Sequence, residues 1–399
     1  MNDFKYFLPK MVVGLLLLVF AVPASAYAME TATWIPWFGP NNGLDGVKSA
    51  TKNIKKIDTI YLFTVEGNSD GTLRQRVDFK DKNWQKFIKT ARDNNVEVIP
   101  TVAWFDGDQI QAVLSDDTAR AAHIAEIVKM VNENDFDGVD IDYEQKNKES
   151  KDDFSAFIVD LKKALDTKIL SCTLEARTPP DSLYKVIPEK IEYSNDYAVI
   201  NKNCDRVPIM AYDQQRADLK LNEVRKGLPY EPVADKDWVK KVVELAVKDI
   251  DKDKILLGVP TYGRAWDVTV APEWYRDYTR VASLNHPRIL YLSKKYKSKI
   301  GRTEGGEAVI SYFPEDSAYK KLIKGTKVPK GTPKGYEAAA QALAYATKNN
   351  QEVQVRFVTW SDATAVKDKI DLAAKYKLRG TAIFKVDGEE DPKIWKLSK

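Results

Sequence analysis

Short runs rich in β-branched and aromatic residues alternate with amphipathic helical patterns along most of this chain. Eight runs are predicted to form strands: 33–38, 59–65, 96–104, 136–143, 169–174, 206–212, 255–260 and 380–384. Helical spacing follows between them, as at Trp84, Phe87, Ile88 and Ala91. Strands that alternate with helices indicate parallel βα units, and eight of them predict an α/β fold closed into a (β/α)8 TIM barrel. A doubly wound open sheet is the alternative, weakened because no glycine-rich phosphate loop follows the first strand.

One connection breaks this regular pattern. Roughly 90 residues separate the seventh strand from the helix that precedes the eighth, whereas loops in such folds run about 2–6 residues. The segment is rich in aromatic residues and has its own helical pattern at 336–347. We predict an insertion over about 267–355 that packs over the carboxyl-terminal face of the barrel.

The first 28 residues have the pattern of a secretory signal peptide. Basic Lys5 and Lys10 precede an apolar run of 12 residues at 11–22, and two small-x-small cleavage sites follow at 24–28. An uncleaved anchor is the alternative, although the run is short for a bilayer. We expect a mature chain of 29–399 that is secreted or associated with the cell envelope, with no membrane span after cleavage.

Composition narrows the chemistry. The 62 Lys and Arg residues nearly balance the 58 Asp and Glu residues, and no basic cluster stands out, which argues against nucleic acid as a partner. The chain has two histidines, too few for a zinc site or a His-based triad, and His123 is expected on the surface of a charged helix. Export permits a disulfide between Cys172 and Cys204, but two buried free thiols are equally compatible with the sequence. Carboxylates, tyrosines and tryptophans are left to carry any chemistry.

The fourth predicted strand carries a row of acids. Asp140, Asp142 and Glu144 alternate with apolar residues, so all three carboxyl groups lie on one face, about 7 Å apart. In a barrel this face points inward and ends at the mouth. Burial and mutual repulsion should keep at least one acid protonated near neutral pH, as a general acid requires. A solvated acidic strand edge is the alternative, but it fits poorly with the apolar opposite face.

The segment 137–144, Asp-Gly-Val-Asp-Ile-Asp-Tyr-Glu, resembles the DxxDxDxE signature of glycoside hydrolase family 18, the chitinases and their relatives. Met-Ala-Tyr-Asp at 210–213 is similar to the family motif M-x-Y-D, and Gly-Val-Pro-Thr-Tyr-Gly-Arg at 258–264 is similar to G-x-P-x-Y-G-R. The resemblance spans nearly the whole mature chain. It implies a (β/α)8 barrel, a small α+β domain inserted after strand seven, and hydrolysis of β-1,4-linked N-acetylglucosamine.

The resemblance also implies roles for individual residues. Glu144 would protonate the glycosidic oxygen and later activate water. The N-acetyl group of the substrate would act as the nucleophile, oriented by Asp142, whose protonation Asp140 would set. Tyr212 would bind the acetamido oxygen, with Asp213 close to the same sugar. Retention of configuration is expected, with no metal or cofactor.

The remaining expected contacts are with substrate. Met210, Tyr262 and Arg264, from the two shorter motifs, would line neighbouring subsites. Trp37 and Trp104 end the first and third strands, where sugar-stacking platforms belong, although core packing fits them equally.

Two segments depart from the best-known chitinases. Residues 101–105 read Thr-Val-Ala-Trp-Phe where the family usually has S-x-G-G. Phe384 stands where the eighth strand usually supplies a tryptophan under the cleaved sugar, and its ring offers a smaller stacking area. Both departures leave catalysis in place and shift the expected substrate away from crystalline chitin.

The sequence therefore predicts a monomeric secreted glycosidase acting on a polysaccharide or oligosaccharide that contains N-acetylglucosamine, such as chitin or chitooligosaccharides. A peptidoglycan or glycoprotein-glycan N-acetylglucosaminidase of the same family is one alternative. A non-catalytic lectin-like chitin-binding protein is another, disfavoured because Glu144 is present.

Overall fold

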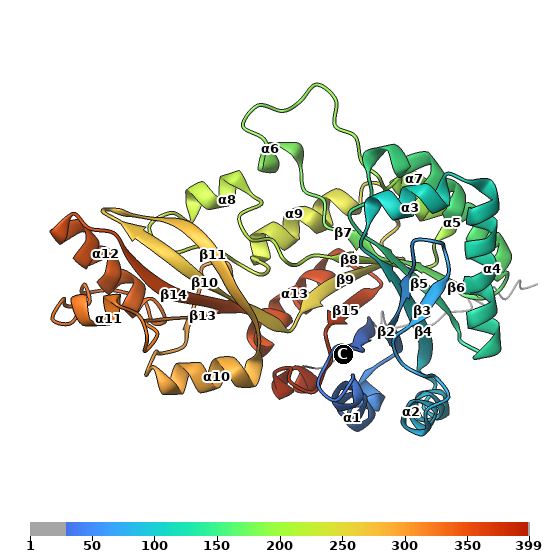
Figure 1. Ribbon diagram of the computed structural model, residues 1–399, viewed down its shortest axis with the longest axis horizontal. Helices are drawn as coiled ribbons and strands as arrows, with labels where there is room; N and C mark the ends of the chain where they lie inside the picture. The colour runs from blue at the N-terminus through green and yellow to red at the C-terminus, as the bar shows by residue number, and fades with distance from the viewer. Residues whose placement is uncertain (1–28, 398–399) are drawn as a thin grey trace, which may run out of the picture.

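A barrel and an antiparallel sheet lie side by side in the computed structural model, which describes residues 29–397 (Figure 1). The predicted signal segment lies outside the described residues. The barrel strands are β1 (Glu30–Pro36), β2 (Thr59–Gly67), β4 (Glu97–Trp104), β5 (Gly138–Tyr143), β6 (Ile169–Cys172), β7 (Leu174–Glu175), β8 (Val207–Met210), β9 (Ile255–Pro260) and β15 (Gly380–Phe384). All eight predicted strands are present, the fifth as the pair β6 and β7.

The barrel is nearly closed. Parallel pairing runs in the order β6-β5-β4-β2-β1-β15-β9-β8-β7, so the first strand pairs with the last. The fifth strand breaks at Thr173. Its first half, β6, contacts the start of the sixth strand through a bridge between Ser171 and Arg206, and its second half, β7, pairs with β8. The short β3 (Leu73–Gln75) adds antiparallel to β2. The predicted (β/α)8 barrel is confirmed.

Strand alternation divides the core into two layers. On β1, Trp34 faces the barrel interior, where it packs with Tyr61, while Ile35 faces the helices. The amino-terminal end of the barrel is closed by Arg206, which forms an ion pair with Glu30 at 3.2 Å.

Helices connect the barrel strands, and most of them cover the outside of the barrel (Figure 1). They are α1 (Leu44–Lys52), α2 (Lys82–Asp93), α3 (Gly107–Leu114), α4 (Asp117–Glu133), α5 (Lys151–Leu165), α6 (Pro180–Leu183), α7 (Tyr197–Asn203), α8 (Leu219–Val224), α9 (Lys236–Ala246) and α13 (Ala363–Tyr376), with 3-10 turns at Ile54–Lys56, Lys148–Ser150 and Pro392–Lys396. The helix α2 buries the predicted apolar stripe and begins at Asp81, whose side chain accepts a hydrogen bond from the backbone N–H of Asn83 at 2.8 Å. No described helix is both long enough and apolar enough to cross a membrane.

His123, on α4, is buried, so the expectation that it lies on the surface was wrong. Its Nδ1 lies 2.5 Å from the carbonyl oxygen of Gly71, and its Nε2 is hydrogen-bonded to the Tyr143 hydroxyl. Burial lowers the pKa of the imidazole, which favours a neutral ring. Because α4 carries many charged residues, its sequence did not show that the polar His123 faces inward.

Cys172, at the end of β6, forms a disulfide with Cys204, which follows α7. The structure thus selects the bridge over free thiols. The bond ties the fifth barrel strand to the chain segment that leads into the sixth.

The second sheet lies between β9 and α13 in the chain. Its order is β11-β10-β14-β13-β12, antiparallel throughout. The elements are β10 (Tyr262–Ala271), β11 (Trp274–Asn285), α10 (His286–Lys295), β12 (Gly301–Arg302), β13 (Ala308–Tyr312), α11 (Tyr319–Leu322), α12 (Glu337–Asn349) and β14 (Val353–Trp360). The helix α12 packs on the sheet through Ala339, Ala342 and Ala346. Because β10 begins two residues after β9 ends, its first residues lie at the barrel mouth.

Candidate active site

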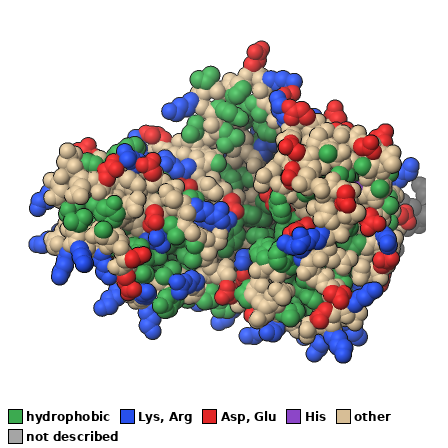
Figure 2. All heavy atoms as spheres, viewed as in Figure 1, with side chains coloured by type: hydrophobic (Ala, Val, Ile, Leu, Met, Phe, Trp, Pro, Cys, Tyr) green, Lys and Arg blue, Asp and Glu red, His purple; other side chains and the backbone are tan. Residues whose placement is uncertain are grey.

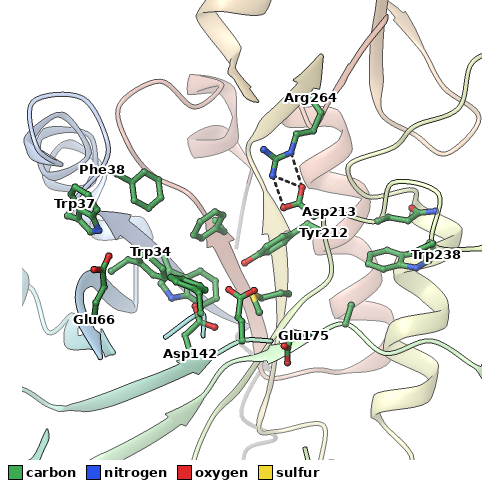
Figure 3. Close-up of a pocket in the computed structure, with 18 residues that line it drawn as sticks. Trp34, Trp37, Phe38, Glu66, Asp142, Glu175, Tyr212, Asp213, Trp238 and Arg264 are labelled. Carbon is green, nitrogen blue, oxygen red and sulfur yellow. Dashed lines mark hydrogen bonds and ion pairs between the residues drawn. The ribbon is translucent and has the colours of Figure 1, made fainter. Parts of the chain in front are cut away.

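The cleft at the barrel mouth has a volume of about 530 Å³ and lies in the hollow between the barrel and the second sheet (Figure 2). Eight of its 18 lining residues are aromatic: Trp34, Trp37, Phe38, Phe63, Phe105, Tyr212, Trp238 and Phe384. Phe384 stacks on Tyr212 with ring centroids 5.4 Å apart and meets the edge of Trp34 at 5.9 Å. Asp142, on β5, lies beside this aromatic floor (Figure 3).

Asp140 is the deepest of the three acids and is fully buried. Its Oδ2 accepts hydrogen bonds from Thr101 at 2.9 Å and from the Trp34 indole at 3.4 Å, and its Oδ1 accepts one from Thr173 at 2.8 Å. Burial raises the pKa of this carboxyl group even though these bonds oppose the rise. Asp140 is not part of the cleft lining, and it acts on the site through its charge, which raises the pKa of Asp142.

Asp142 is also buried, but it faces the cleft. Within residues 29–397 its Oδ1 has no hydrogen-bond partner. Burial, followed by the charges of Glu144 and Asp140, raises the pKa of Asp142 well above its ordinary value. The carboxyl group therefore keeps its proton to a higher pH than a free aspartic acid does, and it presents an unpaired oxygen to whatever fills the cleft.

Glu144 ends the row at the cleft surface. Burial is the main cause that raises the pKa of Glu144 to about 7, and the nearby carboxylates of Glu175 and Asp213 raise it further, while Lys146 lowers it. A carboxyl group with this pKa can give and take a proton near neutral pH. The structure thus places two carboxyl groups with raised pKa values next to each other, and the two share their protons as a unit.

A second wall of the cleft holds the turn that follows Glu144. Glu175, on β7, accepts hydrogen bonds from the backbone N–H of Gln145 at 3.0 Å and from the Asn195 amide at 3.2 Å. The buried Lys146 folds back to donate to the carbonyl oxygen of Tyr143. These contacts fix residues 143–146 around the acid.

Asp213 and Arg264 form the rim on the side of the second sheet. The guanidinium group binds both oxygens of Asp213 at 2.7 Å, and it lies 4.8 Å above the Tyr262 ring. Tyr262 is buried behind the lining, edge-on to Tyr212 at 6.3 Å. Tyr262 therefore contacts Tyr212 and does not itself line the cleft.

Eight of the eleven residues expected at the site line the cleft: Trp37, Asp142, Glu144, Met210, Tyr212, Asp213, Arg264 and Phe384. Trp104 does not, and the expectation that it binds substrate was wrong. On β4, Ala103 faces the barrel interior, so Trp104 faces the helices, where it packs on His123 at 5.5 Å and Tyr143 at 5.6 Å. Among the described residues, no group of three or more His, Cys, Asp or Glu side chains could hold a metal ion.

A family model described as "Glycosyl hydrolases family 18" matches residues 37–389, which include every residue that lines the cleft except Trp34. The chain belongs to this family. Membership makes it a glycosidase, and it confirms the resemblance seen in the three sequence motifs.

Relatives of this family 18 chain include two proteins of Bacillus subtilis. The uncharacterized glycosylase YvbX is 25% identical over 296 residues, which cover 73% of this chain and 69% of YvbX. The putative sporulation-specific glycosylase YdhD is 26% identical over 220 residues, 53% of this chain and 47% of YdhD.

Solved structures share the fold of the family 18 chain. The spore cortex-lytic enzyme SleL of Bacillus megaterium superposes with a TM-score of 0.66 at 21% identity, covering 92% of this chain and 73% of SleL. A chitinase of Chromobacterium violaceum gives a TM-score of 0.66 at 18% identity, covering 92% of this chain and 97% of the chitinase.

Several cleft residues of the family 18 site were missed from the sequence. Phe38, Glu66 and Phe105 follow or end strands one to three, and position at a strand end was the signal that could have found them. Trp238, on α9, is buried, yet it also lines the cleft. Its indole nitrogen has no partner within residues 29–397.

Proposed function

We propose that this family 18 glycosidase cleaves β-1,4 bonds next to N-acetylglucosamine, in chitin or chitooligosaccharides, by substrate-assisted retaining hydrolysis. One observation carries the proposal: the unpaired Oδ1 of the buried Asp142, beside Glu144 in an aromatic-floored cleft. A buried oxygen without a partner costs free energy that a substrate N–H can recover. The N–H of an acetamido group has the right chemistry to do so.

In the first step Glu144 donates its proton to the glycosidic oxygen, and the bond from that oxygen to the anomeric carbon breaks. The acetamido oxygen bonds to the anomeric carbon and gives a cyclic oxazolinium ion. The unpaired Oδ1 of Asp142 accepts a hydrogen bond from the acetamido N–H, and the Asp142 carboxylate stabilises the positive charge. Tyr212, on the floor, donates a hydrogen bond to the acetamido oxygen. In the second step the Glu144 carboxylate takes a proton from water, which attacks the anomeric carbon and opens the ring. Each step inverts the configuration of the anomeric carbon, so the product keeps the configuration of the substrate.

Peptidoglycan is the second candidate substrate. YdhD is named as a putative sporulation-specific glycosylase, and the solved SleL structure is a spore cortex-lytic enzyme. Phe384 in place of the usual tryptophan floor also suits a branch that does not act on packed chitin. Glycoprotein glycans offer the same N-acetylglucosamine chemistry to the same acids.

A binding-only, lectin-like role has less support. Such a protein needs no carboxyl group that titrates near neutral pH, and the site keeps Glu144 with a pKa of about 7.

Secretion, or retention at the cell envelope, belongs to the same proposal. It is supported by the signal-like segment 1–28 and by the disulfide between Cys172 and Cys204, a bond typical of exported proteins. A monomeric state remains part of the proposal.

The test is incubation of the full mature chain with N-acetylglucosamine hexamer and, in parallel, with purified peptidoglycan, with products read by mass spectrometry. We expect shorter oligomers of retained configuration, and no product from Glu144→Gln. A folded wild type that releases muropeptides only would select the second candidate. A folded wild type that cleaves neither would overturn the proposal in favour of binding alone.

A further inference from the structure

A second cavity, the outer groove, lies between α8 and the far end of the β10–β11 hairpin, with a volume of about 600 Å³. Arg216, Asn222, Trp274, Tyr275 and Tyr278 define it here. In Figure 1, α8 lies alongside β11, away from the barrel. The loop after β8 separates the two cavities, since its Ala217 lines the catalytic cleft and its Arg216 lines the outer groove.

The wall of the outer groove on the hairpin is aromatic. Trp274, next to the hairpin turn, is 57% exposed, an unusual state for a large ring that serves only the core. The Tyr278 ring is held in place, because its hydroxyl accepts a hydrogen bond from the backbone N–H of Tyr230 at 3.1 Å and Arg216 lies 5.2 Å from the ring. Fixed rings with polar edges are suited to the face of a sugar, which has apolar C–H groups and hydroxyl edges.

Two polar atoms of the outer groove have no partner. The Asn222 Oδ1 and the Tyr275 hydroxyl are both buried and without a hydrogen bond within residues 29–397. The buried Glu231, next in the chain to the groove residue Tyr230, also has a carboxyl oxygen without a partner there. Unsatisfied buried groups are costly, and a ligand rich in hydroxyl groups would satisfy the two that line the groove.

The charge of the outer groove is nearly balanced. Its basic side chains are Lys185, Arg216 and Lys226, and its acidic side chains are Glu223 and Glu273. Lys226 is already paired with Glu223. A phosphate or nucleic-acid site would need a stronger positive field, so the chemistry favours an uncharged polar ligand.

We propose that the outer groove is a second saccharide-binding site, which holds a stretch of the polymer outside the catalytic cleft. This inference rests on the proposed function for its choice of glycan. In the hairpin register Tyr278 pairs with Val268 and Trp274 pairs with Ala271. At about 3.3 Å per residue, these positions lie roughly 20–30 Å along β10 from Tyr262 at the cleft. A short oligosaccharide bound in the cleft ends before the outer groove, whereas a polymer reaches both.

The test compares Trp274→Ala with Tyr291→Ala, a matched control that removes another exposed ring of the second sheet, on α10 and outside the groove. Binding to insoluble chitin and to purified peptidoglycan is measured in the Glu144→Gln background. Loss of one stacked ring should weaken binding to one of the polymers about fivefold. In the active chain, the ratio of polymer cleavage to N-acetylglucosamine tetramer cleavage should fall by a similar factor. The Tyr291→Ala control should match its parent in both assays.

Unchanged binding of Trp274→Ala to both polymers would overturn the second site, as would a loss that is equal for polymer and tetramer. Because the binding assay needs no hydrolysis, it judges the outer groove even if the wild type cleaves none of these glycans. A wild type that cleaves none of these glycans would overturn the proposed function but not the outer groove as a binding site.

Discussion

The ammonium group of Lys146 lies 3.8 Å from Oε2 of Glu175, and the charges of both residues act on Glu144. Their effects oppose each other, since the carboxylate raises the pKa of Glu144 and the ammonium group lowers it. The pair therefore sets the pH at which the proposed acid loses its proton.

Glu175→Gln should lower the pKa of Glu144. The substitution removes a negative charge while Lys146, Asp213 and Asp142 remain, so the protonated form of Glu144 loses support. The alkaline limb of the pH–rate profile should then move to lower pH by roughly half a unit. Glu149→Gln removes an exposed carboxylate nearby and serves as the control. An alkaline limb that stays in place in Glu175→Gln would contradict this account of Glu144.

Asp142→Asn should make the protein more stable in alkali. Below about pH 4 Asp142 is protonated in the folded and unfolded chains alike, so its raised pKa has no effect there. As the pH rises toward the folded-state pKa, the unfolded chain loses this proton first and the native state loses stability. Asparagine does not ionise, so Tm at pH 8 should exceed that of the wild type by on the order of 2 °C. The difference should vanish near pH 4, and an exposed change, Asp152→Asn, should show no such trend.

Trp104→Ala should damage stability and spare substrate affinity. The ring is buried against His123 and Tyr143, and its loss should lower the free energy of unfolding by about 3–5 kcal/mol. Phe384→Ala, on the cleft floor, should instead raise KM for the hexamer severalfold. Urea unfolding and hexamer kinetics separate the two. A raised KM in Trp104→Phe, which keeps an aromatic ring in the core, would return Trp104 to the substrate site.

Removing the disulfide should lower stability without removing the site. The bond closes a loop with a sequence separation of 32 residues, and such bonds contribute about 2–4 kcal/mol. Cys172→Ala with Cys204→Ala should therefore lower Tm, and a reducing agent should lower the wild-type Tm to a similar value. A wild-type Tm that ignores the reducing agent would show that the thiols are not bonded in solution.

The barrel could be predicted because each strand is a compact apolar run, and the acid row because strand geometry has a fixed period of two. For β4, however, the sequence does not show which of the alternating side chains face the barrel interior. Whether Ala103 or Trp104 faces the barrel interior depends on pairing with β2 and β5, which no local pattern contains. His123 was misplaced for a related reason, since its partner Tyr143 lies on a different element. The unpaired Oδ1 of Asp142 is likewise a property of the packed site, and no residue type encodes it.

The pairing of Glu30 with Gly380 also has a consequence for how the chain is made. A polypeptide that emerges from its amino terminus presents β1 long before β15 exists, and until then one edge of β1 has no neighbour. Contacts this distant in sequence slow folding and keep the ring open during synthesis. Any truncation before Gly380 would leave β1 and β9 with bare edges that can recruit other chains. The barrel can therefore close only after β15 has been synthesised, and the cleft at its mouth is completed late in synthesis.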